Sequence, residues 1–261
     1  EKSGAEILVQ CLIDLGVDTV FGYPGGAVLP IYDTIFGHTA INHVLVRHEQ
    51  AAAHAAEGYA RSTGKPGVVL VTSGPGATNA ITGITDALLD SIPIVVITGQ
   101  VATHLIGTDA FQEADTVGLT RHCTKHNYLV KDPGNLARVV HEAFHIATSG
   151  RPGPVVIDIP KDVQVATAAY EKPVLNAHPS YRPQIEPDAS VIEQTVDLIM
   201  KAERPILYTG GGIINSGPGA SLSLRALAEL TGAPVTSTLM GLGAFPASSR
   251  QWLGMLGMHG T

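Results

Sequence analysis

The residue best placed to do chemistry in this sequence is Glu49, which follows a short apolar stretch and opens an alanine-rich segment. The pattern predicts a strand at residues 44–46 that leads directly into a helix, with the acid in its first turn. A carboxylate there complements the helix dipole, so one interpretation is a surface cap. Six alanines between residues 51 and 60 favour the other interpretation, a buried acid with a chemical task, because other elements can pack closely on so slim a helix. The helix by itself leaves both interpretations open.

Two glycine-rich turns, SGPGATN at residues 73–79 and GGGIIN at residues 210–215, follow apolar runs. The first lacks the Lys-Ser/Thr pair of a P-loop, and Asn215 replaces the third glycine of the dinucleotide fingerprint. Ligands of open α/β sheets bind just beyond the carboxyl ends of the strands, so the turns indicate two ligands or two parts of one site. The alternative is that they are only tight turns, in which glycine eases the backbone.

A third pattern, His141-Glu142-Ala143-Phe144-His145, fits the H-E-x-x-H signature of zinc enzymes. The extended signature requires glycine at position 148, where threonine stands, and no third ligand follows before the next apolar run. An amphipathic helix with half-exposed histidines is the better interpretation, and we predict no metal ligand in this chain.

The elements that must position these residues alternate along the sequence. Near-continuous apolar runs at residues 67–72, 92–98 and 155–159 are typical of strands buried in a parallel sheet, and helical patterns separate them. We therefore expect an α/β fold, a doubly wound parallel sheet, for residues 1–165. A proline-rich linker is predicted at 166–189, followed at 190–261 by a partial Rossmann-like α/β domain with two strands and the start of a third unit.

The composition excludes several partners. Hydrophobic residues make up 44% of the chain and charged residues 15%, as in compact globular proteins. The formal charge of −7 and the absence of Lys/Arg clusters argue against nucleic acid and membrane surfaces. Two cysteines, Cys11 and Cys123, form neither a framework nor a CxxC pair, which favours buried thiols in a reducing compartment.

Several longer stretches of the sequence are informative together: GYPGGAVLPIYD (22–33), VRHEQAAAHAAEGYAR (46–61), TSGPGATNAITGITDALLDSIPIVVITGQV (72–101), GTDAFQEAD (107–115), SGRPGPVVIDIPKDV (149–163), LMGLGAFP (239–246) and LGMLGMHG (253–260). They resemble the large catalytic subunits of bacterial-type acetohydroxyacid synthases, also called acetolactate synthases, which depend on thiamine diphosphate. The RHE helix and the TSGPG-x-x-N turn also resemble those of pyruvate oxidase and, apart from the acid of RHE, those of glyoxylate carboligase, whereas GTDAFQE and MLGMHG are more discriminating.

The resemblance implies a role for particular residues. Glu49 would hydrogen-bond the aminopyrimidine ring of thiamine diphosphate and so assist deprotonation of its thiazolium carbon. Other predicted catalytic residues are Gly26, Gln112 and Lys161. The cofactor pocket would be lined by Tyr23, Thr72, Pro75, Asn79 and Gln112. The substrate region would be bordered by Ala27, Phe111 and Lys161. Gly25, Gly26 and Ala27 would be small because substrate or cofactor passes close to them. FAD would contact Arg151, Gly210, Gly211, Gly212, Thr238, Leu239, Met240, Leu256, Gly257, Met258 and His259.

The implied domains are a pyrimidine-binding domain at 1–165 and the N-terminal part of an FAD-binding domain at 190–261. The implied reaction is decarboxylation of pyruvate and its joining to a second 2-keto acid, pyruvate or 2-ketobutyrate. It gives 2-acetolactate or 2-aceto-2-hydroxybutyrate, at the first shared step of branched-chain amino-acid biosynthesis. FAD would have no net redox role there.

The family's Mg²⁺ and diphosphate site belongs to a C-terminal domain with a GDG…N pattern, which is not found in these residues. We therefore expect a fragment that is inactive alone. A homodimer or tetramer, a small regulatory subunit and a cytoplasmic location are also implied, with an organelle instead in a eukaryote. The alternatives are a pyruvate oxidase-like or other thiamine enzyme and a non-catalytic FAD-binding module. Glyoxylate carboligase lacks the acid that corresponds to Glu49.

Overall fold

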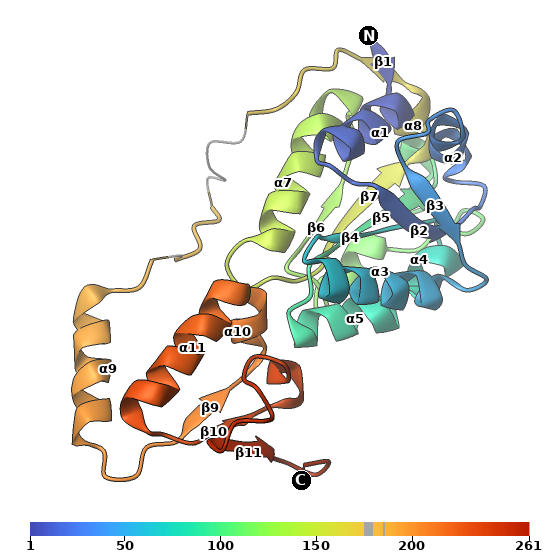
Figure 1. Cartoon of the computed structure of the whole chain (residues 1–261). Coiled ribbons are helices and arrows are strands. Elements are labelled where there is room, and N and C mark those ends of the chain that lie inside the picture. Colours follow the sequence, from blue (N-terminus) through green and yellow to red (C-terminus); the bar gives the residue numbers. More distant parts are fainter. Residues whose placement is uncertain (175–179, 185, 261) are drawn as a thin grey trace. The chain divides into compact units, whose positions relative to one another are not determined.

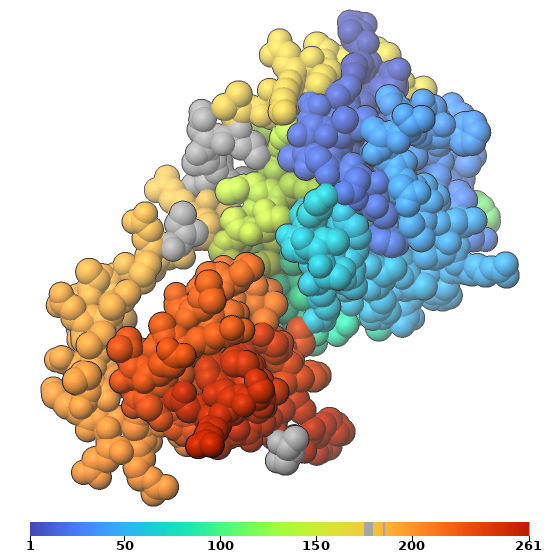
Figure 2. All heavy atoms as spheres, viewed as in Figure 1, coloured from blue at the N-terminus to red at the C-terminus, as the bar shows by residue number. Residues whose placement is uncertain are grey.

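The computed structural model describes residues 1–174, 180–184 and 186–260, which form parts of two compact units, Glu1–Pro183 and Gln184–Thr261 (Figure 1). The first unit runs from blue to yellow and the second from orange to red in the space-filling view (Figure 2). Residues 175–179 and 185 of the predicted linker, and Thr261, lie outside the described residues. None of the helices described is both long enough and apolar enough to cross a lipid bilayer.

The first unit is built on a six-stranded parallel sheet with the order β3-β2-β4-β5-β7-β6. Its strands are β2 (Thr19–Tyr23), β3 (Asn42–Leu45), β4 (Gly67–Val71), β5 (Ile94–Gln100), β6 (His126–Leu129) and β7 (Val155–Pro160). The three strands predicted from apolar runs, β4, β5 and β7, are buried along their whole length. The chain leaves β2 toward β3 and returns on the other side to β4, so the strand order reverses at β2 and β4.

Helices cover both faces of this sheet (Figure 1). One core contains side chains of α1 (Gly4–Asp14), α2 (Leu29–Phe36), α7 (Leu136–Thr148) and α8 (Lys161–Val165). The other core contains side chains of α3 (Glu49–Thr63) and α5 (Ile81–Asp90). Short helices α4 (Pro75–Asn79) and α6 (Thr116–Thr120) and the 3₁₀ turns η1 (Thr103–Leu105) and η2 (Pro133–Asn135) complete the connections. The predicted doubly wound α/β fold is confirmed.

Part of the segment predicted as a linker packs on the first unit. Strand β8 (Thr167–Ala168) pairs in antiparallel fashion with β1 (Lys2–Ser3). Farther along, the hydroxyl of Tyr181 donates a hydrogen bond of 2.8 Å to the carbonyl of Ser149, and Lys125 Nζ donates to that hydroxyl at 3.0 Å. The first compact unit therefore extends to Pro183.

The second unit contains a parallel sheet with the order β11-β10-β9. Its elements are α9 (Ala189–Lys201), β9 (Leu207–Thr209), α10 (Gly211–Asn215), α11 (Pro218–Thr231), β10 (Val235–Ser237), η3 (Leu239–Gly241) and β11 (Trp252–Met255). A small core of Leu224, Ala228, Val235, Ala244 and Phe245 lies between α11 and the sheet. Strand β11, with a glycine inside it, was not among the predicted strands.

Candidate active site

Helix α3 begins at Glu49 because the side chain of His48 caps it: the ring Nδ1 accepts a hydrogen bond from the backbone N–H of Gln50 at 3.1 Å. Gly64, with φ of 73°, ends the helix in the left-handed conformation that favours glycine. The alanines allow the expected close packing, since a Cβ on Gly83 of α5 would lie only 2.5 Å from Cβ of Ala53. The local sequence thus places the acid in the first turn of a tightly packed helix.

The carboxyl group of Glu49 is buried, with 8% of the residue exposed. Asn79, at the end of α4, donates a hydrogen bond from Nδ2 to Glu49 Oε2 at 2.9 Å. A Cβ on Gly76 would lie 3.5 Å from Glu49 Oε1 and 2.7 Å from Cγ2 of Thr72, so only glycine fits between the two side chains. The structure therefore brings together Glu49, Thr72 and Asn79, three residues predicted to share a pocket.

Glu49 follows the carboxyl end of β3, and Thr72 and Asn79 follow that of β4. These two strands flank β2, where the strand order reverses. Thr72 follows β4 directly, and its Oγ1 accepts a hydrogen bond of 3.2 Å from the backbone N–H of Ala27 in the turn after β2. Tyr23 ends β2 and is 41% exposed. In open α/β sheets this crevice is the usual ligand site, so the topology independently indicates the same place.

The small residues after β2 differ in what surrounds them. A Cβ on Gly25 would lie 2.5 Å from Cγ2 of Thr72, so the protein itself requires glycine there. Gly26 is exposed, and a Cβ on it would meet no protein atom within 4 Å. The protein fold therefore does not explain glycine at Gly26.

The segment 107–115 lies against the same crevice through its backbone. Gly74 has a φ of 54°, and a Cβ on it would overlap the backbone carbonyl of Gln112. The residue Gln112 also has a positive φ, of 58°. The carboxylate of Glu113 accepts hydrogen bonds from the backbone N–H groups of Gly107 and Ala110, and these bonds hold its pKa below the usual range. Gln112 thus lies beside the 73–79 turn, with the adjacent Phe111 88% exposed.

Two buried polar residues that sequence reasoning missed support this edge of the sheet. Gln164, which is 1% exposed, donates from Nε2 to the carbonyls of Ala27 at 2.7 Å and Ile159 at 2.8 Å. Asp158 accepts hydrogen bonds from Thr98 and Gln100 of the neighbouring strand. The only feature of the sequence that could have revealed either residue is the carboxylate of Asp158 inside the apolar run of β7.

Lys161 and Pro75 also lie at carboxyl ends of strands, because Lys161 begins α8 directly after β7 and Pro75 begins α4 after β4. Both are exposed. Arg151 lies elsewhere, before the start of β7, where its Nε donates to Ser91 Oγ at 2.7 Å and its Nη2 to the carbonyl of Leu89 at 3.1 Å. The structure therefore does not bring Arg151 to the edge that carries Glu49.

The second unit has a comparable edge. The predicted residues follow the three parallel strands, with Gly210, Gly211 and Gly212 after β9, Thr238, Leu239 and Met240 after β10, and Leu256, Gly257, Met258 and His259 after β11. The backbone N–H of Thr238 donates to the carbonyl of Thr209 at 2.9 Å, and a Cβ on Gly211 would lie 3.2 Å from that of Met240. The first two turns are therefore in contact.

The H-E-x-x-H pattern on α7 is engaged in other contacts. Arg138 Nη1 lies 2.8 Å from both carboxylate oxygens of Glu142. His145 packs edge-on against the ring of Tyr181 with the centroids 6.0 Å apart. The prediction that both histidines are half-exposed is wrong for His141, which is 6% exposed and whose Nε2 is buried without a hydrogen-bond partner. An ion pair accounts for Glu142, and ring packing accounts for His145.

Comparisons with known proteins agree along most of the chain. Residues 2–119 match the family model described as thiamine pyrophosphate enzyme, N-terminal TPP binding domain, and residues 192–261 match the one described as thiamine pyrophosphate enzyme, central domain. The chain belongs to the thiamine pyrophosphate enzymes. The resemblance predicted from the sequence is thereby confirmed.

Among thiamine pyrophosphate enzymes, the chain is similar to large subunits of acetolactate synthase. It is 55% identical over 261 residues to that of Mycobacterium tuberculosis, which covers 100% of this chain and 42% of the relative. It is 55% identical over 259 residues to that of Corynebacterium glutamicum (99% and 41%) and 54% identical over 261 residues to isozyme 3 of Escherichia coli (99% and 45%). The chain thus spans less than half the length of these curated relatives.

The residues at the Glu49 edge fit the aminopyrimidine part of the cofactor that gives thiamine pyrophosphate enzymes their name. Asn79 occupies Oε2 of the buried carboxyl group, and no described residue donates a hydrogen bond to Oε1. Gly76 and Gly25 keep the space around Thr72 clear of side chains. A weakly basic ring nitrogen that carries or shares a proton would give Oε1 the partner that the protein does not supply.

Proposed function

We propose that the whole protein is a thiamine diphosphate-dependent carboligase of the acetolactate synthase type. It would decarboxylate pyruvate and join the two-carbon unit to pyruvate or 2-ketobutyrate, giving 2-acetolactate or 2-aceto-2-hydroxybutyrate. The observation that carries the proposal is the buried Glu49 carboxylate at the topological switch point, with Asn79 on one oxygen and the other available. The similarity to acetolactate synthase large subunits supports the choice of reaction.

Bound thiamine diphosphate supplies the electron sink that makes decarboxylation of a 2-keto acid possible. In our proposal Glu49 holds a proton between Oε1 and the aminopyrimidine ring, and Asn79 fixes the orientation of that carboxyl group. Burial strengthens this hydrogen bond, because water does not compete for it. Tyr23, Thr72, Pro75 and Gln112 would complete the cofactor pocket.

The substrate would lie where the protein leaves room beside this pocket. Gly26 meets no protein atom at its Cβ position, which is consistent with a ligand passing close to it. Ala27, Phe111 and Lys161 would border the same region. The exposed ring of Phe111 and the exposed ammonium of Lys161 are suited to the apolar methyl group and the carboxylate of a 2-keto acid.

The remaining assignments rest on the resemblance. FAD would bind at the carboxyl edge of the second unit, at residues 210–212, 238–240 and 256–259, with Arg151 as a further contact. We propose that Mg²⁺ and the diphosphate are held in a part of the protein outside these 261 residues. A homodimer or tetramer, a small regulatory subunit, a role in branched-chain amino-acid biosynthesis and a cytoplasmic location in a bacterium are parts of the same proposal.

The test is acetolactate formation from pyruvate by the full-length protein, with and without thiamine diphosphate and Mg²⁺. We expect product only when both are present. Peroxide release that depends on oxygen, with no acetolactate, would instead make the protein an oxidase. FAD binding without any thiamine-dependent product would reduce it to a flavin-binding module and overturn the proposal.

A further inference from the structure

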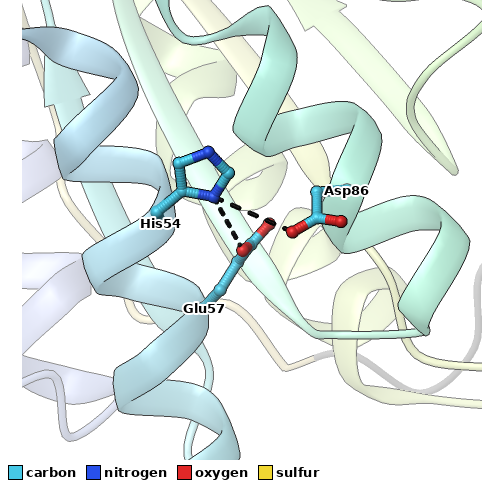
Figure 3. Close-up of side chains that lie close together, drawn as sticks. All are labelled: His54, Glu57 and Asp86. Carbon is cyan, nitrogen blue, oxygen red and sulfur yellow. Dashed lines mark hydrogen bonds and ion pairs between the residues drawn. The ribbon is translucent and has the colours of Figure 1, made fainter. Parts of the chain in front are cut away.

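A second acidic site lies farther along the helix that Glu49 opens. His54 and Glu57 of α3 face Asp86 of α5, and their ligating atoms all lie within 4.8 Å of one another (Figure 3). His54 Nδ1 is 3.1 Å from Glu57 Oε2 and 3.8 Å from Asp86 Oδ2. Within residues 1–174, 180–184 and 186–260 no other three His, Cys, Asp or Glu residues have metal-ligand spacing.

The packing of two helices explains why these groups meet. Ala53 and Gly83 allow α3 and α5 to approach so closely that a side chain on Gly83 would overlap Ala53. His54 and Glu57, three residues apart, share the face of α3 beside this contact, and Asp86 lies one turn beyond Gly83 on α5. The same small residues that allow tight packing therefore hold the three polar groups together.

The protein leaves one of these groups incompletely satisfied. Glu57 is only 4% exposed, and its Oε1 is buried without a hydrogen-bond partner. Figure 3 shows its carboxylate pointing between His54 and Asp86. A buried carboxylate oxygen without a hydrogen-bond partner is costly. A cation between the three side chains would remove this deficit.

We propose, contrary to the sequence-based prediction of no metal ligand, that His54, Glu57 and Asp86 bind a divalent transition-metal ion of the Zn²⁺ class. Zn²⁺ bonds of about 2.0–2.2 Å in tetrahedral geometry place neighbouring ligand atoms about 3.4 Å apart, and the two distances given above lie on either side of this value. An imidazole nitrogen with two carboxylates suits Zn²⁺ better than Mg²⁺ or Ca²⁺, which prefer oxygen ligands. The exposed sides of His54 and Asp86 leave a fourth position to water.

The bound ion would link the middle of α3 to the middle of α5. This site would be separate from the site of the Mg²⁺ that thiamine enzymes use with the diphosphate. The chain contains a matched control in the H-E-x-x-H pattern of α7. There Glu142 is already paired with Arg138, and among the described residues its His and Glu side chains do not form a group of three with metal-ligand spacing. The more familiar zinc signature is therefore expected to bind nothing.

The experiment is equilibrium dialysis of the full-length protein, stripped of metal, against ZnCl₂ in buffer with excess Mg²⁺. We expect one tightly bound Zn²⁺ per chain. His54→Gln and Asp86→Asn should each weaken binding at least about 10-fold, since even the loss of a supporting group around a metal site costs 10–100-fold. Both side chains are partly exposed, so these variants should fold, which far-UV circular dichroism would verify.

The control variant His145→Gln should leave the affinity and stoichiometry unchanged. Co²⁺ in place of Zn²⁺ should give the visible absorption of a four-coordinate ion in the parent protein and lose it in His54→Gln. The absence of bound Zn²⁺, or binding that survives both His54→Gln and Asp86→Asn, would overturn the proposal.

Discussion

Glu49 and Asp158 are both buried carboxylic acids of the first unit, but the protein supplies them with different numbers of hydrogen-bond donors. Asp158, 1% exposed, accepts hydrogen bonds on both oxygens, from Thr98 Oγ1 at 2.6 Å and from Gln100 Nε2 at 2.9 Å. Glu49 accepts one, from Asn79. The number of donors that the protein supplies distinguishes a carboxyl group that holds strands together from one that is left open to a ligand.

The Asp158 network nevertheless reaches the candidate site. Gln100 Nε2 also donates to the carbonyl of Ala114 at 2.8 Å, at the end of the segment that carries Gln112. Burial raises the pKa of Asp158 to about 7, against the opposing hydrogen bonds from Thr98 and Gln100. Its role is therefore to fix the strands and this segment, and we expect its loss to affect stability first.

The largest expected effect is that of Glu49→Gln on turnover. The amide can still accept the hydrogen bond from Asn79 but cannot hold the proton, so acetolactate formation by the full-length protein should fall about 10²- to 10⁴-fold. The free energy of unfolding should change by less than about 1 kcal/mol, because the substitution replaces one hydrogen bond by another and leaves no buried group without a partner. Parent-like activity of this variant would remove Glu49 from the proposed mechanism.

Asp158→Ala should have the opposite profile. It leaves the hydroxyl of Thr98 and the amide of Gln100 without their acceptor in a buried place, at about 1–3 kcal/mol for each group. We expect the free energy of unfolding, measured with urea, to fall by about 2–4 kcal/mol, and Asp158→Asn to lose less. A loss for Asp158→Ala no larger than that for Glu49→Gln would contradict the comparison.

The third prediction concerns the dependence of stability on pH. Because the folded-state pKa of Asp158 lies near 7 and an unfolded aspartate titrates near 4, the folded chain binds more protons between these values. The contribution of Asp158 is fully present below pH 4 and is lost as the pH rises to 7, with a slope of up to about 1.4 kcal/mol per pH unit. Glu57 titrates in the same window, so the difference between the parent and Asp158→Asn isolates Asp158. Parallel stability curves would contradict this prediction.

The sequence predicts the parts of the fold that depend on local patterns. Continuous apolar runs revealed β4, β5 and β7, because strands buried on both faces need no alternation. The helix expected between the 73–79 turn and Asp90 is divided at Ala80 into α4 and α5, and its pattern of side chains does not show the break. Strand β11 is short and a glycine interrupts its apolar residues, so only pairing with β10 identifies it.

The residues of the candidate site that belong to local sequence motifs were predicted. Those that depend on contacts between distant segments were missed. Glu49, Thr72 and Asn79 come from two such motifs, and the structure brings them together. The hydrogen bond from Gln164 to Ala27 joins residues 137 positions apart, and the contact of His54 with Asp86 depends on how two helices pack. No local pattern encodes such contacts.

The most direct test of the role of Glu49 is the rate at which bound thiamine diphosphate exchanges its thiazolium C2 proton for deuterium. It is measured by quenched NMR in the full-length parent, Glu49→Gln and Asp158→Asn, each saturated with cofactor. We predict exchange at least about 100-fold slower in Glu49→Gln and close to the parent rate in Asp158→Asn. Exchange at the parent rate in Glu49→Gln would contradict the account.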